Sequence, residues 1–79
     1  MTGAIITTFY NEISIIFDEV VKYAEITVKD KSGNTVLVEK SFNTNQVNIA
    51  VKFDAEGIFN VTVKTEKDIF NKRIFIKKK

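Results

Sequence analysis

No histidine, cysteine, proline or tryptophan occurs among the 79 residues of this sequence. Without histidine and cysteine, the chain has no imidazole base, no thiol nucleophile, no disulfide and none of the usual zinc ligands. It also lacks the Ser-x-x-Lys and Gly-x-Ser-x-Gly motifs that mark an activated serine. We therefore expect no enzymatic activity, no cofactor and no metal site.

Long apolar runs and a strongly basic composition are missing too. No apolar stretch reaches the roughly 20 residues that a membrane helix needs. The sequence has a single arginine, so it offers no basic patch interleaved with aromatic residues for nucleic acid. No basic region precedes the first apolar stretch, so we expect no signal peptide. These features predict neither a membrane span nor nucleic-acid binding.

The residues that are abundant favour β-structure. Isoleucine, valine and threonine supply 11, 9 and 8 residues, whereas there are four alanines and one leucine. β-Branched side chains suit strands better than helices. A chain of this length builds one hydrophobic core, so residues 1–79 are expected to form a single domain.

Apolar and polar residues alternate between breaks that recur every 8 to 12 residues or so, which is typical of a sandwich or barrel. The alternation predicts about seven strands, at 4–10, 12–17, 22–30, 35–42, 46–53, 58–65 and 69–76. Two sheets packed face to face would bury one side of each strand. We therefore expect an all-β, immunoglobulin-like sandwich of short antiparallel strands, with a closed barrel as the alternative.

The same alternation predicts which side chains form the core. Ile13, Ile15 and Phe17 share one face of the second strand. The inward sets of the last three strands are Val47, Ile49, Val51 and Phe53; Phe59, Val61 and Val63; and Phe70, Ile74 and Ile76, with Lys72 interrupting the last set. The phenylalanines expected to supply core volume are Phe17, Phe42, Phe53, Phe59, Phe70 and Phe75.

Three groups of polar or aromatic residues could bind a ligand, and each has a simpler explanation. Asp30-x-Ser32-x-Asn34 matches the start of a calcium loop, but side-chain hydrogen bonds within a turn explain it as well. The carboxylate pairs Asp18-Glu19 and Asp54-x-Glu56 could serve glycoside hydrolysis, but adjacent acids in loops are typical of solvated turns. Tyr10 and Tyr23 could present rings to a glycan or cover cross-strand neighbours.

The net charge of +2 is unevenly distributed along the chain. Residues 1–63 carry five lysines and eight acids, whereas residues 64–79 carry seven cations and two acids. The basic end includes Lys77, Lys78 and Lys79. It could keep a strand edge from pairing with neighbours, or contact an acidic partner or a secretion machine.

Three segments carry a family resemblance: ISIIFDEVVKYAEITVKDKSG at 13–33, DAEGIFNVTVKT at 54–65 and the terminal NKRIFIKKK. This order resembles small immunoglobulin-like domains of Bacteroidetes secreted and surface proteins. Two groups are similar, namely a short Bacteroides domain family of unknown function and the C-terminal sorting domain of the type IX secretion system. Gly57-x-Phe59-x-Val61 also stands where many immunoglobulin domains carry Gly-x-Tyr-x-Cys.

The resemblance implies a secreted or cell-surface location. The function expected from it is a non-catalytic interaction or structural module, which would contact a protein partner through an exposed strand edge or through loops. The alternative is a C-terminal sorting domain that a secretion system recognises, with Lys77, Lys78 and Lys79 near the recognised end. The sequence predicts no oligomeric state.

Overall fold

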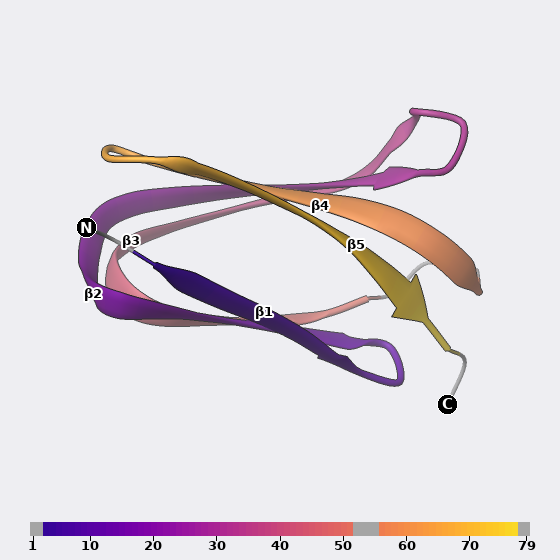
Figure 1. Ribbon diagram of the computed structural model, residues 1–79, viewed down its shortest axis with the longest axis horizontal. Coiled ribbons are helices and arrows are strands. Elements are labelled where there is room, and N and C mark those ends of the chain that lie inside the picture. Colours follow the sequence, from indigo (N-terminus) through magenta and orange to yellow (C-terminus); the bar gives the residue numbers. More distant parts are fainter. Residues whose placement is uncertain (1–2, 52–55, 78–79) are drawn as a thin grey trace.

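The computed structural model describes residues 3–51 and 56–77, and this part of the chain is all-β and antiparallel. Its strands are β1 (Ala4–Phe9), β2 (Glu12–Asp30), β3 (Thr35–Ala50), β4 (Gly57–Thr65) and β5 (Ile69–Ile76). They form one sheet in the order β1-β2-β4-β5, with β3 paired to β2 (Figure 1). The expected all-β fold is therefore confirmed.

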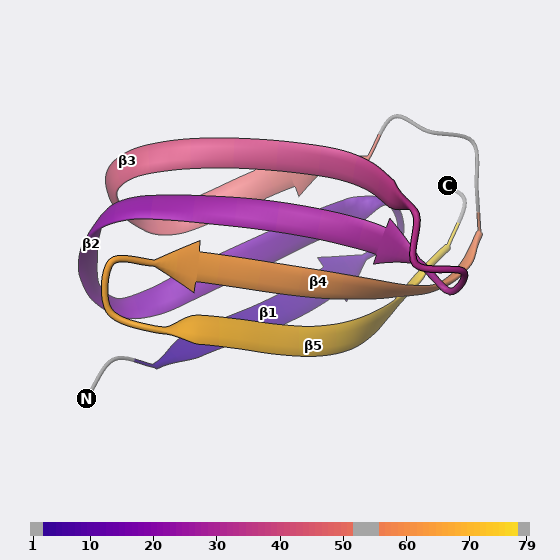
Figure 2. The same cartoon turned by 90° about the horizontal axis from the view of Figure 1, so that it is seen from above.

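The sheet curls over so that it makes two layers (Figures 1 and 2). The lower layer contains β1, the beginning of β2 and the end of β3. The upper layer contains the rest of β2 and β3 together with β4 and β5. Both β2 and β3 therefore pass from one layer to the other, and the core lies between the layers.

The prediction of seven strands was wrong for the described part of the chain, which has five. The expected strands at 12–17 and 22–30 are continuous in β2, and those at 35–42 and 46–53 join in β3, which ends at Ala50. The polar residues between them do not end the strands. Instead they lie where the strands bend between the layers.

A register shift produces the bend. Ile16 pairs with Gln46 and Val21 pairs with Thr44, so four residues of β2 face one residue of β3. Asn43 lies beside this point and has a positive φ of 52°. An irregularity of this kind increases local twist and bends the strand. The bend allows a chain of few strands to cover its own core.

The core consists mostly of isoleucine and valine. Phe17 and Phe59 are buried and Phe70 is half-buried, as expected. Phe42 and Phe75, however, point outward and are 68% and 55% exposed, so their assignment to the core was wrong. The buried apolar residues are Ile6, Ile13, Ile15, Phe17, Val21, Ala24, Ile26, Val28, Val47, Ile49, Val51, Phe59, Val61, Val63, Ile74 and Ile76. Apart from Phe53, which lies outside the described residues, the inward sets of the last three strands are thus confirmed, with Phe70 only half-buried.

β1 and β5 lie next to each other but form no strand pairing. The Lys77 backbone N–H donates a hydrogen bond to the Tyr10 carbonyl at 3.2 Å. Lys72, which interrupts the inward face of β5, donates from its Nζ to the Ile6 carbonyl at 2.6 Å. These contacts hold the two margins of the curled sheet together without closing it into a hydrogen-bonded barrel.

Candidate functional site

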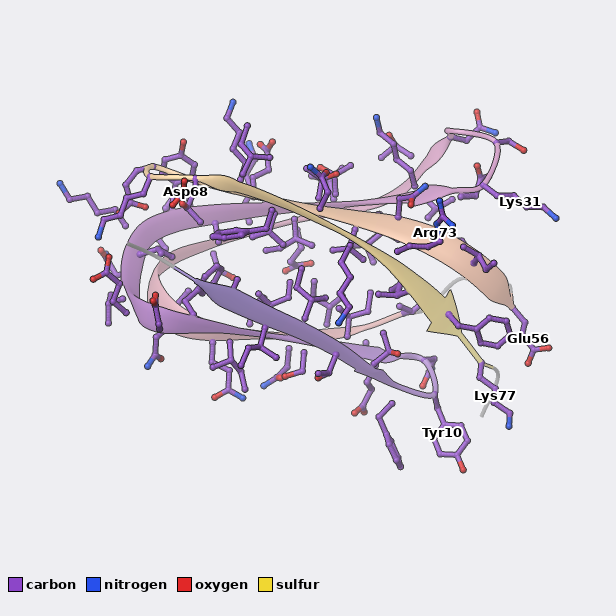
Figure 3. The ribbon with its side chains drawn as sticks, in the orientation of Figure 1. Tyr10, Lys31, Glu56, Asp68, Arg73 and Lys77 are labelled. Atoms are coloured by element: carbon purple, nitrogen blue, oxygen red, sulfur yellow. The ribbon has the colours of Figure 1, made fainter. Side chains whose placement is uncertain are left out.

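The basic end of the chain is described only as far as Lys77. This residue follows β5, and its side chain is exposed (Figure 3). Tyr10, whose carbonyl accepts the Lys77 backbone hydrogen bond, packs its ring against Phe9 in an edge-on arrangement with centroids 4.7 Å apart. Lys78 and Lys79 lie outside the described residues.

Asp30, Ser32 and Asn34 form a turn between β2 and β3. The Asp30 Oδ1 accepts hydrogen bonds from the backbone N–H groups of Ser32 and Asn34, each at 2.9 Å. The hydrogen bond from Asn34 is the largest cause that lowers the pKa of Asp30. Gly33 supports the turn with a φ of 90°. The arrangement matches the interpretation of these residues as a turn, in which the carboxylate accepts hydrogen bonds from the backbone.

Of the two carboxylate pairs, only Asp18-Glu19 lies wholly within the described residues. Asp18 and Glu19 lie in the bend of β2, where Glu19 forms an ion pair with Lys67 and raises the pKa of that lysine. Asp54 lies outside the described residues. In the described ranges, 3–51 and 56–77, no group of three or more acidic residues is placed to hold a metal ion.

Glu66 has a structural role at the same bend. Its Oε2 accepts a hydrogen bond from the Lys22 backbone N–H at 2.8 Å, and this bond is the main cause that lowers the pKa of Glu66. The carboxylate thereby satisfies a backbone donor where the β2–β3 register is shifted. The sequence placed Glu66 in a turn but gave no sign of this contact.

On the outer face of the upper layer, four polar residues form two cross-strand pairs. Lys40 and Glu25 are 3.7 Å apart across β3 and β2, and Thr62 Oγ1 donates to Asn71 Oδ1 at 2.8 Å across β4 and β5. Tyr23 is half-buried on this face, directly opposite Phe42 in the register. The cross-strand interpretation of Tyr23 therefore fits its position.

The most accessible part of the sheet is the outer edge of β3 over residues 35–44, which we call the β3 edge. Along its inner side β3 pairs with β2, and no other described strand pairs with it (Figure 2). Val36, Val38 and Phe42 are exposed along this segment, with Val38 at 54%. The β3 edge thus combines unpaired backbone groups with apolar side chains.

The sequence predicted a strand at 35–42 but not its place at the margin of the sheet. The run Val36, Leu37 and Val38 could have indicated this place. Its apolar residues lie on both faces of a strand, so at least one of them stays exposed whichever face turns toward the core. Pairing order is a long-range property, so this local pattern did not identify β3 as the edge strand.

Two comparisons of the sequence with known proteins give no match. The chain matches no protein-family model, and no curated protein has a significantly similar sequence. In the described part of the chain there is no helix long and apolar enough to cross a membrane. The functional interpretation therefore starts from the surface of this structure.

Proposed function

We propose that this domain is a non-catalytic interaction module that adds an extended segment of a partner protein to the β3 edge. The observation that carries the proposal is an edge strand of 16 residues that is paired on one side only and exposes Val36, Val38 and Phe42. Backbone groups of an added strand would supply affinity, and alternate side chains would supply specificity.

The β3 edge has little of the protection that edge strands usually have, apart from a register shift at Val36. Natural sheets block their edges with proline, lysine, bulges or very short strands. Over residues 35–42 there is no proline, and Lys40 is the one lysine, which already lies 3.7 Å from Glu25. By contrast, the margin formed by β1 and β5 is bridged by Lys72 and by the Lys77 backbone. β3 is therefore the margin best suited to strand addition.

A different protein fits this edge better than a second copy of the chain. Two-fold antiparallel pairing centred on the middle of the segment would place Glu39 opposite Glu39 of the second copy, or Lys40 opposite Lys40 of the second copy. Like charges directly opposite each other are unfavourable. The partner strand should instead carry apolar residues against Val36 and Val38, with an acidic residue near Lys40.

The finer fold and the setting of the domain belong to the same proposal. A short immunoglobulin-like sandwich is supported by the two layers and by the buried Phe59 and Val61 of the Gly57-x-Phe59-x-Val61 segment. The resemblance to Bacteroidetes domains supports a secreted or cell-surface parent protein. Sheet edges and end loops are the parts such sandwiches commonly use for contacts.

Selection from a library of random 12-residue peptides, displayed against the immobilised chain, tests the proposal. We expect the selected peptides to slow amide hydrogen exchange within residues 36–43 on binding. The double variant Val38→Lys/Phe42→Lys should weaken binding at least about tenfold, because it places charge along the edge. The matched control Ile69→Lys changes an equally exposed apolar residue on β5 and should bind normally.

Three results would contradict strand addition at this edge. They are a library that yields no binder, a double variant that binds as tightly as the parent chain, and exchange protection that falls outside β3. Amide spectra of both variants must match the parent chain in the core, so that loss of binding is not loss of folding.

A further inference from the structure

The outer face of the lower layer contains a hollow that the proposed function does not use. It has a volume of about 460 Å³ and spans β1, the beginning of β2 and the end of β3. Its outward-facing residues are Thr7, Phe9, Glu12, Ser14, Asn48 and Ala50. We call this site the β1–β3 hollow.

Strand register explains how these residues come together. Thr7 lies opposite Ser14, and Ser14 lies opposite Asn48, which makes a row of two hydroxyls and an amide across three strands. In the adjacent row, Phe9 lies opposite Glu12 and Glu12 lies opposite Ala50. Side chains directly opposite in such pairs are about 5 Å apart. The small side chain of Ala50 leaves the space between these rows open.

The polar groups of the hollow are available for a ligand. On the upper layer, Thr62 bonds Asn71 and Lys40 pairs with Glu25. In the β1–β3 hollow, by contrast, the side chains of Thr7, Ser14, Asn48 and Glu12 form no hydrogen bond or ion pair with any described residue. These side chains can therefore bind a ligand without breaking a contact within the described part of the domain.

Phe9 adds an apolar platform beside these groups. Its ring is 66% exposed, and the edge-on contact with Tyr10 at 4.7 Å fixes its position at the end of β1. A large aromatic side chain left in water beside polar groups is a feature of binding sites, where a ligand covers the ring face. A ligand for this hollow therefore needs an apolar face and several hydroxyl groups.

We infer that the β1–β3 hollow binds a neutral oligosaccharide. The C–H face of a sugar ring would stack on Phe9, while its hydroxyls would donate to Glu12 and exchange hydrogen bonds with Asn48 and Ser14. Among the described residues, the lining contains one carboxylate and no lysine or arginine, which disfavours phosphate, sulfate and acidic sugars. A hydroxyl-rich uncharged ligand therefore matches both the exposed ring of Phe9 and the polar groups beside it.

The test is a titration of the ¹⁵N-labelled chain with maltohexaose, cellohexaose, xylohexaose and laminarihexaose, each to about 10 mM, which detects a Kd of about 1 mM. At least one sugar should shift the amide signals of residues 7–9, 12–14 and 48–50. Phe9→Ala and Ala50→Leu should each weaken that binding about tenfold or more, by removing the platform and by filling the hollow.

A matched pair of variants separates the hollow from the rest of the face. Asn48 and Gln46 are exposed on the same side of β3, two residues apart, and Gln46 lies outside the hollow. Asn48→Ala should weaken binding, whereas Gln46→Ala should not. The inference is overturned if none of the four sugars shifts the signals, if the shifts lie elsewhere, or if the two variants behave alike. Peptide binding at the β3 edge is measured separately, so either result can fail without the other.

Discussion

Isoleucine and valine fill most of the space between the two layers of this domain. Their branched side chains have few rotamers to lose on burial, and they pack well on a pleated surface. The two fully described buried phenylalanines, Phe17 and Phe59, lie in β2 and β4, the two strands at the centre of the sheet. Aromatic volume is therefore placed where neighbouring strands can surround it.

Replacement of Phe59 tests this packing. Phe59 is buried opposite Ile74 of β5, so Phe59→Ala should lower the free energy of unfolding by about 3–5 kcal/mol through the cavity it leaves. Phe75→Ala, on β5 but facing outward, should cost less than about 1 kcal/mol. Urea denaturation of both variants gives the comparison, and equal losses would contradict the assignment of the two faces.

Alternation predicted the buried face of a strand where every second residue was clearly apolar. It failed where apolar residues occur on both faces of the strand. Val61 and Val63 follow the pattern and are buried. Phe42 and Phe75 point to the face opposite that of the nearest buried residues in their strands. They were assigned to the core because of their size alone. Hydrophobic residues are common on protein surfaces, so size without parity is a poor guide to burial.

Glu66 makes stability depend on acidic pH. Its pKa is lowered from an ordinary value of 4.5, so folding favours the carboxylate. The resulting stability is present above pH 4.5 and is lost as the pH falls through the lower pKa of the folded chain. Glu66→Gln should lower stability at pH 7 and flatten the acid decline. Denaturation midpoints between pH 7 and pH 2.5 or so measure both effects.

At the scale of the element, the two long strands determine the architecture. Each of β2 and β3 contributes to both layers, so the crossing between layers needs no separate loop. The sequence contained the positions of the bends, at Asp18-Glu19 and at Asn43-Thr44-Asn45, but these residues looked like the ends of strands. Whether polar residues end a strand or bend it depends on pairing with a distant segment, and that pairing is not visible in local patterning.

Asn43 is the residue through which the bend of β3 can be tested. Its φ of 52° suits asparagine or glycine and is unfavourable for a β-branched side chain. Asn43→Val should therefore lower the free energy of unfolding by about 1–2 kcal/mol, whereas Asn43→Gly should leave it nearly unchanged.

Asn45 provides the control because it is also exposed in β3 but has no positive φ. Asn45→Val should change stability by less than about 0.5 kcal/mol. Urea denaturation of the three variants measures these changes in the free energy of unfolding. If Asn43→Val were as stable as Asn45→Val, the conformation of Asn43 would not be what maintains the bend.

At the scale of the whole molecule, the two proposed surfaces lie on different layers. The β3 edge belongs mainly to the upper layer, and the β1–β3 hollow lies on the outside of the lower layer. Local sequence patterning does not link Thr7, Ser14 and Asn48, because the β1–β2 and β2–β3 registers bring them together. The surfaces could therefore be recognised only once the strands were paired.

The basic end of the chain is the part that the sorting alternative would use. Replacing Lys77, Lys78 and Lys79 with serine changes the net charge from +2 to −1, since three cations are removed. The Lys77 contact with Tyr10 uses a backbone N–H, which serine also has. We therefore expect the triple variant to keep its unfolding free energy within about 0.5 kcal/mol and to bind β3-edge peptides normally.

An export assay distinguishes the interaction module from the sorting domain. Residues 1–79, fused to the C-terminus of an inert exported reporter in a host with a type IX secretion system, should remain in the periplasm if the domain acts only as an interaction module. Arrival at the cell surface that requires the secretion machinery, and that falls in the serine variant, would instead assign the basic end to sorting. Because the variant is expected to stay folded, a fall in export could not be attributed to unfolding, and the β3 edge would then need a role compatible with transport.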